Sequence, residues 1–260
     1  MGGEMTAGGE DRRRLILVGA RDVGQVEISE AAARLGVSVE TIRRDIKLLE
    51  EQGLVTRRHG GAYPVESAGF ESSLDMRSGS RVAEKLRIAM TVVGLLDEAE
   101  TIYLDEGYTP YLVAEQLATL TRPLTIVTSS LQNASVLASK SQHRVIMLGG
   151  RVRGRTLATV DHWALSMLSE FNFGVAILGA NGISRDHGLT TPDPVVAAVK
   201  TAAVHASRRR IFVGVRTKFG VASFCRFAQV SDFETIVTEA SLPAREALLY
   251  SALGPRVIRT

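Results

Sequence analysis

The sequence contains a single cysteine, Cys225, in 260 residues. One cysteine excludes an intramolecular disulfide framework and any zinc site built from several cysteines. Long apolar runs are also missing, because stretches such as 176–180 fall far short of the roughly 20 residues that a membrane-spanning helix needs. The arginines at 12–14 precede only a short apolar stretch, so we expect no secretory leader. These absences predict a cytoplasmic protein that makes no use of the membrane.

A strong net charge is absent as well. The chain carries a formal charge of +3, and residues 1–64 contain ten Lys or Arg and ten Asp or Glu, which cancel. Total charge therefore does not identify nucleic acid as a partner, and the placement of the charges has to decide.

The composition changes along the chain. Residues 12–63 are rich in charge and in helix-forming residues, whereas residues 100–240 repeat an apolar strand, a polar or glycine turn and a helix. Between them lies a glycine- and serine-rich stretch typical of a linker. We therefore predict the following segments: a first domain at 12–65, a linker at 66–80, a second domain at 81–240 and a C-terminal extension at 241–260.

The first segment has the pattern of a helix-turn-helix. Ser29 precedes a short helix that Gly36 ends, and Ser38 is a suitable N-cap for a second helix. In that second helix the apolar residues Ile42, Ile46 and Leu49 recur at helical spacing. Residues 12–20 supply a supporting helix, and residues 54–63 predict two strands around a basic tip, which together form a wing.

If that apolar face is buried, polar residues of the second helix face outward, where a recognition helix meets base edges and phosphates. We expect DNA contacts from Ser38, Thr41, Arg43, Arg44, Lys47, Arg57, Arg58 and His59. Other acidic residues, Glu50 among them, are expected to lie away from this face. Glu40 and Asp45 are exceptions, and Asp45 either orients an arginine or faces solvent. The alternative is that these cations form only the solvated face of an ordinary helix.

The run VSVETIRRDIKLLEEQGLVTRRHGGA at 37–62 resembles the DNA-binding signature of the DeoR family of bacterial sugar-responsive transcription regulators. The resemblance extends from about Arg12 to about Glu239. It implies a winged helix-turn-helix that binds double-stranded operator DNA, usually as a repressor. It also implies a second domain that is similar to phosphosugar isomerases and senses a phosphorylated sugar or related metabolite. Because one reading helix contacts few base pairs, we expect a homo-oligomer, a dimer or a tetramer.

The second segment predicts an α/β fold with a mostly parallel sheet, since apolar strands alternate with helices. The expected strands lie at 101–105, 124–128, 144–148, 174–180, 210–215 and 235–238. The expected helices lie at about 81–96, 108–119, 130–139, 161–169 and 193–206. Ligands of such sheets bind at the carboxyl ends of the strands.

Polar and glycine residues follow several of these strands. Their main-chain N–H groups and small side chains suit an anionic ligand. The candidate effector-binding residues are Asp105, Glu106, Gly107, Tyr108, Thr109, Thr128, Ser129, Gly149, Gly150 and Lys218. Ordinary turn chemistry is the alternative for each turn alone, and Ser130 could be simply an N-cap.

The first of these turns departs from the family pattern. There Glu106 and Tyr108 replace small residues, and a carboxylate beside a phosphate is unfavourable unless a cation intervenes. The last turn keeps Lys218 but lacks the family's aspartate. We therefore expect an effector that differs from the common sugar phosphates, or a sensor that has lost metabolite binding.

Two other functions compete with this prediction. A phosphosugar isomerase needs a carboxylate base, and the turn at 179–184 contains none, so we expect no enzyme activity and no catalytic residue. The second domain could alternatively serve oligomerisation only. The histidines are scattered, so we expect no metal and no cofactor. Trp163 is expected to pack on the sheet.

Overall fold

The computed structural model describes residues 9–23, 25–51, 55–58, 61–64, 81–96 and 99–260. Contacts divide the chain into two compact units, residues 1–80 and residues 81–260, and each is described by itself. None of the helices in these ranges is long and apolar enough to cross a membrane.

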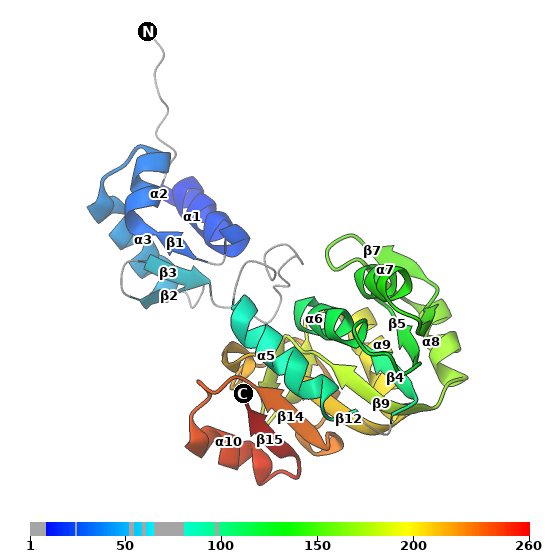
Figure 1. The fold of residues 1–260 in the computed structure, drawn as a ribbon. Coiled ribbons are helices and arrows are strands. Elements are labelled where there is room, and N and C mark those ends of the chain that lie inside the picture. The colour runs from blue at the N-terminus through cyan, green and yellow to red at the C-terminus, as the bar shows by residue number, and fades with distance from the viewer. Residues whose placement is uncertain (1–8, 24, 52–54, 59–60, 65–80, 97–98) are drawn as a thin grey trace. The chain divides into compact units, whose positions relative to one another are not determined.

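The described residues of the first unit form three helices and a small antiparallel sheet in the strand order β1-β3-β2 (Figure 1). Its elements are α1 (Gly9–Val23), β1 (Val26–Glu27), α2 (Ile28–Leu35), α3 (Val39–Glu51), β2 (Val55–Arg58) and β3 (Gly61–Pro64). This is the predicted winged helix-turn-helix. The first short helix begins at Ile28, one residue before the Ser29 that we expected to precede it.

The turn between α2 and α3 depends on Gly36. This residue has φ 63° and ψ 32°, a left-handed conformation that glycine adopts without steric cost, and it ends α2. The second helix then turns Ile42, Ile46 and Leu49 inward, where they are buried against Ile16 of α1. The predicted apolar spacing therefore fixes which face of α3 is left for solvent.

The second unit is built on a seven-stranded parallel sheet in the order β15-β14-β12-β9-β4-β5-β6. Its strands are β4 (Thr101–Leu104), β5 (Thr125–Thr128), β6 (Arg144–Met147), β9 (Phe173–Leu178), β12 (Ser207–Val213), β14 (Thr235–Thr238) and β15 (Arg256–Arg259). The first six match the strands predicted from sequence, so the expected α/β fold is confirmed.

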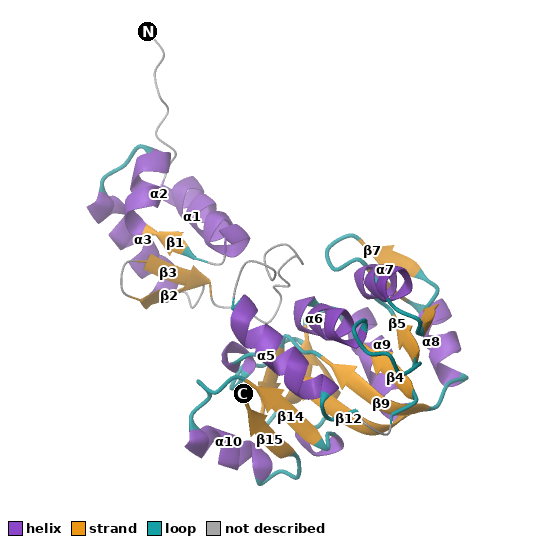
Figure 2. Cartoon of the chain, viewed as in Figure 1, coloured by secondary structure: helices purple, strands orange, loops and turns teal. Residues whose placement is uncertain are grey.

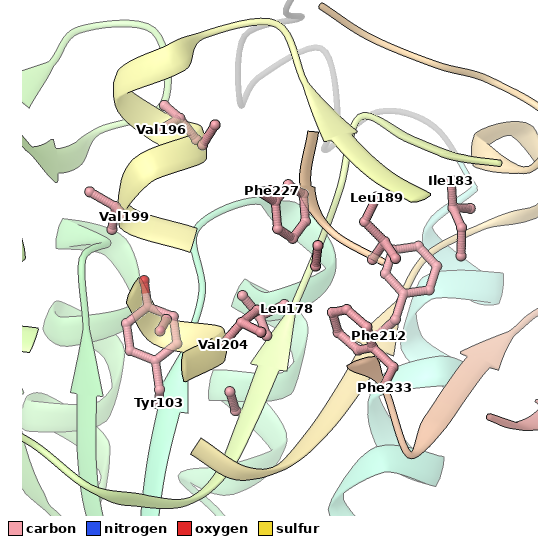
Figure 3. Close-up of a cluster of buried hydrophobic side chains, with 14 of the residues drawn as sticks. Tyr103, Leu178, Ile183, Leu189, Val196, Val199, Val204, Phe212, Phe227 and Phe233 are labelled. Atoms are coloured by element: carbon pink, nitrogen blue, oxygen red, sulfur yellow. The ribbon is translucent and has the colours of Figure 1, made fainter. Parts of the chain in front are cut away.

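Helices cover both faces of this sheet (Figures 1 and 2). One face packs against α5 (Val82–Val93), α6 (Tyr108–Leu117) and α7 (Leu131–Lys140). The other packs against α8 (His162–Ser169), α9 (Pro194–His205) and α10 (Ala244–Ser251). Figure 3 shows part of the second core, in which Val196, Val199 and Val204 of α9 lie near Tyr103, Leu178 and Phe227.

Smaller strands lie outside the main sheet. A hairpin joins β7 (Arg151–Arg153) and β8 (Ala158–Val160), and a second small sheet joins β10 (Gly182–Ser184), β11 (Gly188–Thr191) and β13 (Cys225–Ala228). Two short 3-10 helices, η1 (Arg216–Lys218) and η2 (Val230–Asp232), follow β12 and β13. The sequence pattern did not predict these elements.

Two expectations about the second unit need correction. Residues 241–260, which we separated as an extension, supply α10 and the edge strand β15, whose pairing with β14 makes them part of the sheet. Trp163 does not pack on the sheet. It is 62% exposed, and its ring lies 4.9 Å from that of His162.

Candidate DNA-binding and effector-binding sites

The recognition helix α3 begins with a pair of hydroxyl side chains. Ser38 Oγ accepts a hydrogen bond from the main-chain N–H of Thr41 at 3.1 Å, and the two hydroxyl oxygens lie 2.8 Å apart. This bond satisfies one of the N–H groups that the start of a helix leaves without a partner. Ser38 is therefore the predicted N-cap, and both hydroxyls stay near the protein surface.

The cations of α3 lie on its outward face. The side chains of Arg43 and Lys47 are about 60% exposed, and Arg44 is exposed as well. Together with Arg57 of β2 they line an open hollow of about 290 Å³. The structure thus brings four of the predicted DNA-binding cations to one surface, which we call the basic face.

Carboxylates accompany three of these cations. Arg43 Nη1 lies 3.5 Å from Glu40, and Lys47 Nζ lies 3.8 Å from Glu51. Arg57 Nε lies 2.5 Å from Glu50 Oε2. Exposed pairs of this kind contribute little to stability and are screened by salt. The exposed pair of Lys47 and Glu51 can therefore exchange its carboxylate for phosphate at small cost.

We expected Glu50 to lie away from the basic face, but it is hydrogen-bonded to Arg57, which is part of that face. Its Oε1 accepts the main-chain N–H of Arg57 at 2.9 Å, while Oε2 accepts the guanidinium. The main-chain hydrogen bond, followed by the side-chain hydrogen bond, holds the pKa of Glu50 below its ordinary value. This carboxylate ties β2 of the wing to α3. Arg58 ends β2, and His59 lies outside the described residues.

Asp45 orients arginines, one of the two roles considered for it. Its side chain is 3% exposed and accepts Arg12 Nε at 2.5 Å, with Arg13 Nη1 at 3.5 Å. Both arginines belong to α1, so this buried pairing joins the recognition helix to the supporting helix. Asp45 contributes to the fold of the first unit and not to its outer surface.

In the second unit, Asp105 follows β4 and is 1% exposed. Its Oδ2 accepts a hydrogen bond from the main-chain N–H of Gly179 at 2.9 Å, and its main-chain oxygen accepts Asn133 Nδ2 at 2.8 Å. Asp105 therefore joins the ends of β4 and β9 to α7. The Asp105 carboxylate thus holds its own turn in place. Both of these hydrogen bonds are made to other groups of the chain and not to a ligand.

The cation that sequence analysis missed is Lys200 of α9. This side chain is 1% exposed, and its ammonium donates to Asp105 Oδ2 and, at 3.3 Å, to the main-chain oxygen of Gly179. The ammonium also lies 5.6 Å from the centre of the Phe227 ring. The available signal was a single lysine within the apolar run 195–204, because a buried lysine requires a carboxylate partner.

Glu106 is buried at 6% exposure, and its Oε1 lies 3.9 Å from Lys200 Nζ. Glu106 therefore has a cation beside it, which a phosphate placed near this carboxylate would require. Burial, followed by the charge of Asp105, raises the pKa of the neighbouring Tyr103 phenol, which stays protonated at neutral pH. We call Asp105, Glu106 and Lys200 the buried ionic cluster.

The rest of this turn starts α6. Gly107 has φ 113°, a value that L side chains rarely adopt, so glycine is required there. Tyr108 stacks on Tyr111 with ring centres 6.0 Å apart, and Lys85 Nζ lies 5.2 Å from the centre of its ring. Thr109 is buried. The aromatic ring that departs from the family pattern is thus placed beside a second cation.

The turn after β5 is occupied by local hydrogen bonds. Thr128 Oγ1 accepts the main-chain N–H of Ser130 at 3.1 Å, and Ser130 Oγ caps α7 by accepting the N–H of Asn133. The main-chain oxygen of Ser129 accepts Thr159 N at 2.8 Å. Ser130 is therefore an N-cap, as the simpler interpretation held, and all three residues of 128–130 are buried.

The second of the two glycines after β6, Gly150, has a structural cause. Gly150 has φ 128°, and a Cβ there would lie 2.3 Å from the main-chain oxygen of Val160 in β8. The close approach is to the chain's own hairpin. Gly149 is exposed, and its N–H lies 3.1 Å from Met167 Sδ.

Lys218 ends η1, the 3-10 turn beyond β12, and is partly buried. The same turn is fixed by Glu239, which accepts the main-chain N–H of Arg216 at 2.8 Å and the guanidinium of Arg81 at 3.3 Å. Because the strands are parallel, the turns that carry Asp105, Thr128, Gly149 and Lys218 all lie at the carboxyl edge of one sheet.

The described parts of the chain contain no group of three or more His, Cys, Asp or Glu arranged to hold a metal ion.

Comparison with known families covers almost the whole chain. A family model described as a DeoR-like helix-turn-helix domain matches residues 12–68. A second model, the DeoR C-terminal sensor domain, matches residues 80–240.

Individual relatives have similar lengths. An uncharacterized helix-turn-helix transcriptional regulator of Bacillus subtilis, FruR, is 32% identical over 88% of this chain and 91% of its own. The glycerol-3-phosphate regulon repressor of Escherichia coli is 33% identical over 85% of this chain and 86% of its own. A solved ribose 5-phosphate isomerase from Methanocaldococcus jannaschii covers 54% of this chain and 55% of its own, at 15% identity and a TM-score of 0.40, too low to bear on function.

Proposed function

Because the chain belongs to the DeoR family of transcriptional regulators, we propose that it is a repressor that binds operator DNA through α3 and the wing. The observation that carries the proposal is the basic face, where Arg43, Arg44, Lys47 and Arg57 converge although residues 1–64 carry no net charge. Arginine pairs bidentately with guanine, whereas lysine and hydroxyl groups more often hold phosphate. Such a protein acts on chromosomal DNA in the cytoplasm.

Footprinting of the purified full chain on genomic DNA tests this function. We expect protection of discrete sites, with affinity at least about 10³-fold above that for random DNA at physiological salt. Equal affinity for all sequences would contradict the proposal. The genes beside the protected sites would also identify the regulated pathway, and their transcripts should rise when the protein is removed.

The second unit is proposed to sense a small metabolite at the carboxyl edge of its sheet. The name of the E. coli relative supports control of carbohydrate or related genes by a phosphorylated compound. The buried ionic cluster has two carboxylates and one ammonium, so an additional anion beside Glu106 is disfavoured. The effector is therefore proposed to differ from common hexose and pentose phosphates, unless this domain has lost metabolite binding.

Isothermal titration against a panel of hexose and pentose phosphates tests the effector proposal. We expect no micromolar binding. Micromolar binding that Lys218→Ala abolishes, and that the exposed-lysine control Lys140→Ala retains, would contradict it.

A regulator without isomerase activity is proposed. The turn after β9 carries no carboxylate, and the Asp105 carboxylate is already bound to Lys200 and Gly179. An assay of aldose-ketose interconversion with ribose 5-phosphate should detect no turnover. Turnover that Glu106→Gln removes would favour the enzyme instead.

The chain is also proposed to act as a dimer or a tetramer. One recognition helix reads only a few base pairs, and paired half-sites lie about 34 Å, or one helical turn, apart. Effector binding would then favour an arrangement that does or does not match this spacing. Sedimentation should show a dimer or larger at concentrations that saturate operator, and a monomer there would contradict the proposal. An effector-dependent change in operator affinity would exclude a purely oligomerising role.

A further inference from the structure

Glu40 is an acidic residue among the cations that line the hollow of the basic face. It lies in the first turn of α3, its side chain is 61% exposed, and it lines the same hollow as Arg43, Arg44, Lys47 and Arg57. A carboxylate at this position opposes attraction to phosphate, so the general electrostatics of DNA binding do not explain it.

The rotation of α3 fixes where Glu40 points. Ile42 and Ile46 are fully buried, which holds the opposite side of the helix outward. Glu40 precedes Arg44 by four residues and Lys47 by seven, so the three share one stripe of the exposed face. Residues at the N-terminal end of a recognition helix are the ones that contact base edges in the major groove. Glu40 is at that end.

The partner of Glu40 reduces its repulsion of DNA without removing its acceptor atoms. Arg43 Nη1 lies 3.5 Å from Glu40 Oε2, so the pair carries no net charge. A carboxylate has two oxygens and several acceptor positions, and one such contact leaves others available. In the major groove, the base-edge donor that a glutamate accepts from is the N4 amino group of cytosine.

We propose that Glu40 is a specificity-determining residue that accepts a hydrogen bond from cytosine N4 in the operator, with Arg43 holding its carboxylate in place. The inference rests on the proposed function, in which α3 is the reading helix. A cytosine-guanine pair at one position of each half-site follows from it.

Glu51 provides a matched control. It is on the same helix, 58% exposed, and paired with Lys47 at 3.8 Å, as Glu40 is with Arg43. Eleven residues separate the two glutamates, about 16 Å along the helix axis at 1.5 Å per residue, so Glu51 is at the end remote from the bases. Glu40→Ala and Glu51→Ala remove equal charge from equally exposed positions.

Selection from a random double-stranded DNA library with the full chain tests the proposal. Wild type should enrich a motif with cytosine at one position of each half-site. Glu40→Ala should keep the rest of the motif. Its preference for cytosine at that position should fall at least about fivefold, which is the lower end of the discrimination that one base contact provides. Glu51→Ala should keep the whole motif.

Two results would overturn the inference. A Glu40→Ala motif that equals the wild-type motif would show that Glu40 reads no base. A loss spread evenly over all positions, equal to that of Glu51→Ala, would assign Glu40 to general electrostatics. Failure of wild type to enrich any motif would instead contradict the proposed DNA-binding function, so the two failures are distinguishable.

Discussion

The basic face of α3 and the buried ionic cluster of the second unit use the same chemical pairing in opposite surroundings. On the basic face, Arg43 and Lys47 are about 60% exposed and lie 3.5 and 3.8 Å from their glutamates. In the cluster, Lys200 and Asp105 are each 1% exposed and in direct hydrogen-bonded contact. Exposed pairs are worth little and exchange readily, whereas breaking a buried pair leaves a charge without solvent or partner.

The difference suggests two uses for ion pairs in one chain. In the proposed complex, DNA phosphate would replace Glu51 beside Lys47 at small cost, whereas Arg43 stays with Glu40. The buried pair holds the turn after β4 against the end of β9, because Lys200 also donates to the main-chain oxygen of Gly179. One region is built for exchange and the other for fixed geometry.

The largest effect is expected at Lys200. Lys200→Met should destabilise the second unit by about 3–5 kcal/mol, because Asp105 then keeps a buried charge without its cation. Urea unfolding measures the change. The exposed-lysine control Lys140→Met should stay within about 0.5 kcal/mol of wild type. If Lys200→Met also stayed within that range, the contrast between buried and exposed pairs would be lost.

A smaller effect is expected at Arg44, an exposed cation in the middle of α3. Arg44→Ala should weaken binding to the selected operator by about 1–3 kcal/mol and relax the preference at one base pair. Fluorescence anisotropy against operator and random DNA separates specific from general binding. Arg185→Ala, an exposed change in the second unit, should leave both affinities unaltered. An equal loss on both DNAs would make Arg44 a phosphate contact.

Arg57 should contribute mainly to phosphate binding. Arg57→Ala should weaken binding to all sequences to a similar extent and reduce the slope of log affinity against log salt by about one. Binding measured at four or more salt concentrations gives the slope. An unchanged slope combined with lost sequence preference would place Arg57 at a base instead.

The smallest effect concerns the pH dependence of Glu50. Its pKa is lowered in the folded chain, first by the main-chain N–H of Arg57 and then by the guanidinium. A lowered folded pKa means that the stabilisation is present above the unfolded pKa and is lost as pH falls through the folded pKa. NMR titration should therefore show a midpoint below that of an ordinary glutamate.

Arg57→Ala sharpens this measurement. The main-chain donor, which is the larger cause, survives the substitution, so the Glu50 midpoint should rise only part of the way to its ordinary value. An ordinary midpoint in wild type would contradict the contact between the wing and α3.

Local patterns in the sequence predicted most of the fold. Ser38 and Gly36 mark helix ends through their own backbone chemistry, and the apolar runs at β4, β5 and β9 identify buried strands. The short strands β7, β8 and β10 have three residues each, too few for a period to be recognised. Each pairs with a strand only a few residues away, β7 with β8 and β10 with β11.

The candidate site was predicted less completely, because its contacts join residues that are distant in sequence. Lys200 and Asp105 are 95 residues apart in sequence, and no local pattern pairs them. Gly150 was predicted among the effector-binding residues, and the contact that requires glycine there is with the main chain of Val160. Glu50 was placed away from the basic face because the return of β2 beside α3 is a tertiary contact.

Genomic footprinting of wild type beside the Arg43→Ala/Arg44→Ala double variant tests the central claim most directly. We expect wild type to protect a small set of sites, and the double variant to protect none of them at the same concentration while its unfolding curve matches that of wild type. Protection of the same sites by both proteins would contradict the assignment of α3 as the reading helix.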